Sequence, residues 1–186
     1  MFSARGFFNV SSSVYIVRLT YFYLMVIRIF TTGGTFDKEY DPISQTLVFT
    51  ETRVPKILDR SRCAVQCVVT NLMSIDSLQM KDEHRKAIAE KCKNVAEDKI
   101  IITHGTDTVV KTAEVLAREI TNKTIILTGA LIPYAFRNSD SLFNLGAAIA
   151  LVQTMPNGVY IAMNGKVFPW NKTQKNTKTG MFEELK

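Results

Sequence analysis

Short, almost wholly apolar runs alternate with amphipathic segments along most of this 186-residue chain, and that alternation restricts its fold more than any other feature. The runs lack the period-two pattern of strands with one wet face, so they are typical of strands covered by helices on both faces. We therefore predict an α/β fold with a doubly wound, mainly parallel sheet and helices on both faces. The expected strands are residues 26–30, 64–72, 99–103, 123–129 and 158–163, and the expected helices are residues 53–60, 78–95, 108–120 and 139–153.

Three smaller features complete this predicted organisation. Residues 45–49 alternate polar and apolar side chains, so we expect them to form one arm of a hairpin. The polar, lysine-rich residues 170–180 are expected to form a loop. Ser139 is placed to cap the helix that follows it.

The first 24 residues differ in composition from the rest of the chain. They are rich in serine and aromatic residues, include Arg5 and Arg18, and contain no acidic residue. A targeting segment would look partly like this, but no small-residue cleavage site is visible, and Arg18 interrupts the apolar run well short of membrane-spanning length. We interpret residues 1–24 as a leader or, by preference, as sequence upstream of a start at Met25, and residues 25–186 as the folded domain.

Charge and cysteine content narrow the classes of function. Lys and Arg total 23 against 17 Asp and Glu, and the excess is spread thinly rather than gathered in a patch, which gives little support for a nucleic-acid partner. The three cysteines, Cys63, Cys67 and Cys92, show no zinc spacing and are odd in number. We expect reduced thiols, a cytoplasmic location, no metal and no membrane partner.

Polar residues gather at the expected carboxyl ends of four strands. The segments are TTGGT at 31–35, NLMSID at 71–76, THGTDT at 103–108 and TGALIP at 128–133. Ligands of open α/β sheets bind outside these ends, so we expect the four segments to share one site. The Gly33–Gly34 pair would let backbone N–H groups approach a bound anion or oxyanion, although neither a P-loop nor the three-glycine dinucleotide spacing is present.

Each polar residue at these ends also has a purely structural interpretation. Asp107 and Thr108 can cap the helix that follows them. His104 can be a strand-end residue bonded to nearby backbone, and Ser74 with Asp76 can make a turn. Local pattern alone therefore indicates a polar site at the strand ends and goes no further.

The segments TTGGTFDKEY and IITHGTDT resemble, in the same order, the two threonine motifs of the L-asparaginase family of the bacterial type I and type II kind. The similarity continues through TIILTGALIP, SDSLFNLGAAIA, MNG and KNTKTGMFE, and covers roughly residues 26–183. The resemblance implies hydrolysis of the side-chain amide of L-asparagine to L-aspartate and ammonia by a threonine nucleophile. It also implies no cofactor and assembly as a homodimer or homotetramer.

Carried over position by position, the first half of the resemblance implies three roles. Thr35 matches the nucleophilic threonine of the first motif. Tyr40, in the loop after it, matches the tyrosine that assists that hydroxyl, because an unaided threonine is a poor nucleophile and must lose its proton as it attacks. Ser74 falls where the family has a serine that holds the α-carboxylate of the substrate.

The second half of the resemblance implies a polar relay. Thr106 matches the second threonine, and Asp107 matches the neighbouring carboxylate that holds the α-amine of the substrate. Lys175 lies twelve residues after Met163, the spacing of the catalytic lysine of the family. The sequence leaves open which threonine attacks, and a solvated loop lysine is the structural alternative for Lys175.

This chain also departs from the usual family pattern. The chain stops where the linker to a second, C-terminal domain would begin, and that domain normally lends a carboxylate to the site of a neighbouring subunit. Ile75 stands where the family usually has a polar residue. A glutaminase, an amidase component of a tRNA-dependent amidotransferase and a non-catalytic amino-acid-binding module therefore stay open as alternatives.

Overall fold

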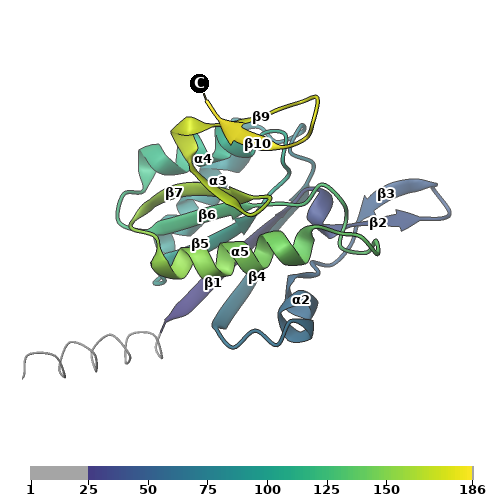
Figure 1. The fold of residues 1–186 in the computed structure, drawn as a ribbon, viewed down its shortest axis with the longest axis horizontal. Coiled ribbons are helices and arrows are strands. Elements are labelled where there is room, and N and C mark those ends of the chain that lie inside the picture. The colour runs from purple at the N-terminus through teal and green to yellow at the C-terminus, as the bar shows by residue number, and fades with distance from the viewer. Residues whose placement is uncertain (1–24, 186) are drawn as a thin grey trace, which may run out of the picture.

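The computed structural model describes residues 25–185, and the interpretation of residues 1–24 lies outside this range. A central sheet of six strands has the order β4-β1-β5-β6-β7-β8, in which all neighbours are parallel except the last pair. Its strands are β1 Val26–Gly33, β4 Gln66–Ile75, β5 Lys99–Thr103, β6 Thr124–Thr128, β7 Gly158–Met163 and β8 Lys166–Pro169. The predicted doubly wound, mainly parallel sheet is confirmed (Figure 1).

Helices cover both faces of this sheet because its central strands are apolar on both sides. The helices are α2 Val54–Arg60, α3 Asp82–Asn94, α4 Val109–Glu119 and α5 Ser141–Thr154. Alternate residues of β5 show the division: Ile100 and Ile102 pack with α3 and α4, whereas Ile101 packs with α2 and α5. Two apolar cores result, one on each face, and they hold the strand ends in fixed positions.

The parallel pairing brings the polar strand ends to one edge of the sheet. Thr31 on β1 lies opposite Thr103 on β5, and Gly33 on β1 lies opposite Ile75 on β4. The segments that follow these strands therefore begin side by side, although they are far apart in the sequence. This is the edge at which the sequence pattern predicts a site.

Two short hairpins lie outside the main sheet. The first pairs β2 Lys38–Asp41 with β3 Thr46–Phe49, which confirms residues 45–49 as a hairpin arm. The second pairs β9 Thr173–Lys175 with β10 Phe182–Glu184. The prediction of a plain loop over residues 170–180 is therefore wrong in part, because a three-residue strand is too short to leave a periodic pattern. The sequence pattern also does not predict β8 or the short 3₁₀ helices η1 Thr35–Asp37 and η2 Trp170–Lys172.

Two helix starts differ from their predicted positions. The helix α3 begins at Asp82 rather than at residue 78, because Asp76 closes a turn by accepting from the N–H of Leu78 at 3.0 Å. The N-cap of α5 is Asp140, not Ser139, although the Ser139 hydroxyl still accepts from the N–H of Ser141 at 3.1 Å. Within residues 25–185, no helix is both long and apolar enough to cross a bilayer.

Candidate functional site

The turn after β1 is wedged against two neighbouring segments. Gly34 has a φ of 75°, and a Cβ placed on it would stand 2.5 Å from the Cα of Gly105. Gly33 has a φ of 95°, and its Cβ would stand 2.4 Å from the backbone N of Ile75. Only glycine fits both the dihedrals and the space. The pair of glycines in TTGGT thus lets this turn fit between the end of β4 and the turn after β5.

Two further glycines draw more of the site together. A Cβ on Gly105 would meet the Oγ of Ser77 at 2.6 Å. A Cβ on Gly129 would lie 2.4 Å from the carbonyl oxygen of His104 and 3.2 Å from the Cγ2 of Thr106. The segments that follow β1, β4, β5 and β6 therefore converge, as the sequence predicted for a common site.

Lys175 reaches this point from the second hairpin. Its ammonium donates to the Oγ1 of Thr106 at 2.8 Å and to the Oδ1 of Asp107 at 2.6 Å. The lysine side chain is 18% exposed and the aspartate side chain 46%. The lysine is thus held between a carboxylate and a threonine hydroxyl, an arrangement that can polarise the hydroxyl and move a proton.

Thr35 begins η1, and this short helix is held by a buried carboxylate, Asp37. Asp37, two residues on, is 3% exposed and accepts from the Oγ1 of Thr52 at 3.1 Å and from the backbone N–H of Arg53 at 3.0 Å. Burial raises the pKa of Asp37, and these hydrogen bonds act in the opposite direction. The residue behind Thr35 therefore ties the turn to the start of α2.

The Tyr40 side chain is bonded to neither threonine within the described residues. Tyr40 stands on β2 opposite Leu47 and is 55% exposed, and its hydroxyl has no hydrogen-bond partner in the described part of the chain. Its assisting role stays a prediction.

An ion pair joins this hairpin to the segment after β4. Lys38 on β2 lies 2.6 Å from the Oδ2 of Asp76, and its ammonium sits 5.2 Å from the ring centroid of Phe49. The hydrogen bond from Lys38 is the main cause that lowers the pKa of Asp76. Asp76 directly precedes Ser77, so the pair connects the Tyr40 hairpin to the turn that touches Gly105.

Two serines are candidates for the residue that binds the α-carboxylate of the substrate. Ser74 lies on β4, is exposed, and accepts from the Nδ2 of Asn71 at 3.4 Å. Ser77 is 1% exposed, faces Gly105, and its hydroxyl has no partner in the described part of the chain. Sequence reasoning missed Ser77 because it ended the strand at residue 72, whereas β4 runs to Ile75 and its following turn begins at Asp76.

His104 is structural, as its alternative interpretation proposed. It is fully buried, with its Nδ1 2.8 Å from the carbonyl oxygen of Gly105 and its Nε2 2.8 Å from the Oγ1 of Thr112. Burial lowers the pKa of His104 to about 4, so the ring is neutral at pH 7. It supports the turn that carries Thr106 through its contact with Gly105, and it brings no charge to that turn.

The capping interpretation is confirmed for the position of Thr108 and is wrong for Asp107. Thr108 is the N-cap of α4 but makes no side-chain cap bond; its hydroxyl donates instead to the carbonyl of Ser77 at 2.7 Å. Asp107 is bonded to Lys175. Both side chains therefore link the turn that carries Thr106 to neighbouring segments.

Free backbone amides lie beside the threonines. The N–H of Gly34 is taken by the carbonyl of Ile75 at 3.0 Å, so it cannot receive a ligand. Those of Thr35, Gly105 and Thr106 have no acceptor among residues 25–185. Amides of this kind can hold the oxyanion of an acyl-transfer intermediate.

The cysteines lie outside the threonine site. Cys63, Cys67 and Cys92 are free thiols, in agreement with the predicted reduced state. Burial raises the pKa of Cys67 and of Cys92 to about 12, so neither supplies a thiolate near neutral pH. In the described range, no group of three or more His, Cys, Asp or Glu side chains is arranged to hold a metal ion.

Comparison of the sequence with known proteins identifies one family. The family model described as "Asparaginase, N-terminal" matches residues 26–184. The L-asparaginase of Thermococcus kodakarensis is 25% identical over 162 residues, 84% of this chain and 49% of the relative. The glutaminase-asparaginase of Pseudomonas aeruginosa is 29% identical over 174 residues, 84% of this chain and 48% of the relative. The chain thus spans about half the length of these relatives.

Solved structures agree with this match. The thermostable L-asparaginase of Thermococcus kodakarensis superposes with a TM-score of 0.76 at 23% identity, over 87% of this chain and 51% of that protein. The probable cytoplasmic L-asparaginase of Campylobacter jejuni superposes with a TM-score of 0.71 at 28% identity, over 86% of this chain and 53% of that protein. This chain therefore belongs to the asparaginase family and corresponds to its N-terminal domain.

Proposed function

We propose that this protein hydrolyses the side-chain amide of L-asparagine to L-aspartate and ammonia, with Thr35 as the nucleophile. One observation carries the proposal: Lys175 bonds to Thr106, and the turn of Thr106 packs through Gly105 against the turn of Thr35. The Thr106 hydroxyl, the Lys175 ammonium and the Asp107 carboxylate are thus bonded together beside the turn that carries Thr35. Relatives named L-asparaginase point to the same reaction.

The proposed reaction has two steps that share one set of groups. In the first, the Thr35 oxygen bonds to the amide carbon while the Tyr40 hydroxyl takes the Thr35 proton and passes its own proton to the amide nitrogen, so that the C–N bond breaks and ammonia leaves. In the second, the oxygen of water bonds to the ester carbon, one proton of that water returns to the Thr35 oxygen as the C–O bond breaks, and aspartic acid leaves and gives its other proton to solvent. Backbone amides at Thr35 and Gly105 would hold the oxyanion in both steps.

The remaining residues position the substrate in this proposal. Asp107 carries the negative charge that suits the α-ammonium of asparagine, while Ser77 or Ser74 donates to its α-carboxylate. Lys175 keeps Thr106 oriented and takes part in proton transfer at the second threonine. Ser77 is favoured over Ser74 because it faces Gly105 with an unpaired hydroxyl in the described part of the chain.

We propose residues 25–186 as the catalytic domain and a cytoplasmic homodimer or homotetramer as the working form. The supporting argument is chemical: Tyr40, at 55% exposed, stands in solvent, and a neighbouring subunit would shield the hairpin that carries it. The small amino-acid substrate needs no nucleic acid and no membrane.

Ammonia release from purified protein tests this function. Asparagine, glutamine and buffer alone are incubated in parallel, and the amino-acid product is identified in each case. We expect aspartate and ammonia in equal amounts from asparagine and a lower kcat/KM for glutamine. Faster turnover of glutamine would make the protein a glutaminase. Calorimetric binding of asparagine without any ammonia would identify the non-catalytic binding module instead.

A further inference from the structure

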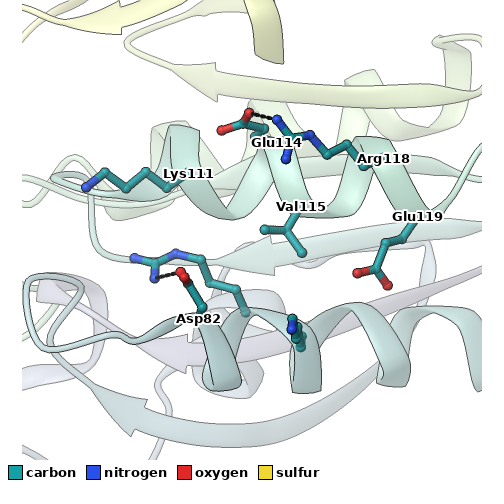
Figure 2. A pocket seen from close by; sticks show the side chains of 8 residues that line it. Asp82, Lys111, Glu114, Val115, Arg118 and Glu119 are labelled. Carbon is teal, nitrogen blue, oxygen red and sulfur yellow. Dashed lines mark hydrogen bonds and ion pairs between the residues drawn. The ribbon is translucent and has the colours of Figure 1, made fainter.

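A charged groove runs between α3 and α4, outside the threonine site. Its volume is about 460 Å³, and Val115, which lines it, projects from α4 into the space between the two helices (Figure 2). In Figure 2, Lys111 and Asp82 lie toward one end of the groove and Glu119 lies at the other. Arg85 bonds to Asp82, so two cations and one acid stand at the first end, which we call the cationic end.

Arg85 forms the buried side of the cationic end. Its side chain is 5% exposed, and its guanidinium donates to the Oδ1 of Asp82 at 3.2 Å and to the Oγ1 of Thr108 at 3.3 Å. A guanidinium has several N–H donors in one plane, and the Nε of Arg85 is buried with no acceptor in the described residues. Its carboxylate partner, Asp82, has a side chain that is 90% exposed. The buried charge is thus compensated by a well-hydrated acid.

Two lysines add positive charge to the same end. Lys86 on α3 and Lys111 on α4 line the groove, and neither ammonium pairs with a carboxylate within residues 25–185. The other acids of the groove already have partners: Glu114 pairs with Arg118 at 2.5 Å, and Glu119 pairs with Lys93 at 2.7 Å. Lys86 and Lys111 therefore leave the groove with an excess of positive charge.

The backbones of α3 and α4 add partial positive charge near these side chains. Arg85 and Lys86 are the fourth and fifth residues of α3, Lys111 is the third residue of α4, and both helices begin at the carboxyl edge of the sheet. The amino end of a helix carries partial positive charge and free N–H groups. The guanidinium is also fixed in place, since Thr108 bonds in turn to the carbonyl of Ser77 at 2.7 Å. A fixed cation loses little freedom when it binds a ligand.

We propose that the cationic end of this groove binds a small dianion, either phosphate or a short dicarboxylate. The oxygens of such a ligand match one fixed guanidinium and two ammonium groups, one from each helix. The site contains neither threonine and is independent of the proposed amidase reaction.

Titration calorimetry at constant ionic strength tests the site, with inorganic phosphate and malonate as separate probes and chloride as the balancing salt. We expect saturable binding of at least one probe, with a Kd that rises on the order of 10-fold in Lys111→Gln and in Lys86→Gln, because each loses a charged hydrogen bond. The matched control is Lys91→Gln, which removes one exposed charge from α3 outside the groove and leaves the Kd unchanged. Which probe binds distinguishes the two kinds of ligand.

A second variant separates this site from the threonine site. Binding in Thr106→Ala should equal that of the wild type, whether or not the wild type releases ammonia. The proposal is overturned if neither probe binds saturably, if Lys91→Gln weakens binding as much as Lys111→Gln, or if Thr106→Ala alone abolishes it.

Discussion

The backbone of Gly34 lies against the backbone of Gly105, so closely that a Cβ on Gly34 would stand 2.5 Å from both the Cα and the N of Gly105. Each of these glycines is followed directly by a threonine, Thr35 in one turn and Thr106 in the other. The contact therefore fixes the two threonine backbones relative to each other. It joins the two motifs that define the site.

Replacing Gly34 by alanine should separate the two turns. The substitution combines a φ of 75°, which L side chains rarely adopt, with a clash against backbone that cannot rotate away. The dihedral alone should cost about 1–3 kcal/mol of the free energy of unfolding, and the displaced turn should lower kcat/KM further. Denaturant unfolding and ammonia release measure the two effects.

Gly146 provides the matched control for that change. It lies within α5, and a Cβ placed on it meets nothing within 4 Å. Gly146→Ala should raise the free energy of unfolding by up to about 1 kcal/mol and leave kcat/KM unchanged. Wild-type kcat/KM in Gly34→Ala would show that the close approach is not needed for the reaction.

The contact between Lys175 and Thr106 gives a second prediction. In Lys175→Met, Thr106 and Asp107 both lose the ammonium that joins them, so kcat should fall about 10²- to 10⁴-fold while the fold is kept. Lys178→Met, an exposed lysine in the same hairpin, is the control and should keep wild-type kcat. Equal activity of the two variants would reduce Lys175 to a structural ion pair.

The ion pair between Lys38 and Asp76 should act on substrate binding more than on turnover. It joins the hairpin that carries Tyr40 to the turn that carries Ser77, so Lys38→Met should raise KM by several-fold more than it lowers kcat. Lys56→Met, which removes an exposed charge from α2, is the control. A double-mutant cycle with Asp76→Asn checks the coupling, and simple additivity would mean that the pair does not position the hairpin.

Stability should fall in mild acid because of His104. The folded-state pKa of this ring is lowered from 6.5 to about 4, so below pH 6.5 the unfolded chain takes up a proton that the folded protein refuses. The free energy of unfolding should therefore decrease from pH 6.5 down to about pH 4, by roughly 3 kcal/mol in total from this group. His104→Asn should show a shallower decrease over that window. Parallel curves for the two proteins would contradict the assignment.

The apolar strands could be predicted because burial on both faces leaves an unbroken hydrophobic run. Once β1 and β5 are predicted as parallel strands, the edge that carries the site can be predicted too, because parallel strands end at the same edge of a sheet. Thr35, Thr106 and Asp107 sit in such turns, so their neighbourhood could be anticipated. The contact between the two turns rests on the backbones of Gly34 and Gly105, which have no side chain to mark the partner.

The rest of the site depends on tertiary packing. Lys175 is brought to Thr106 by a three-residue strand, whose pairing with β10 leaves no periodic pattern. Ser77 was missed because the sequence pattern ended this strand at residue 72 and assigned residues 73–75 to the turn, whereas β4 runs to Ile75. The cationic groove between α3 and α4 could not be predicted for a similar reason: Lys86 and Lys111 look like ordinary exposed lysines until the helices are packed together.

Steady-state ammonia release by Thr35→Ala, Thr106→Ala and the double variant tests the central claim most directly, with Thr177→Ala as an exposed-threonine control. If both hydroxyls serve one amide, each single variant should lose on the order of 10³-fold or more in kcat/KM, the double variant should lose little beyond that, and the control should match the wild type. Full activity in both single variants would contradict the account.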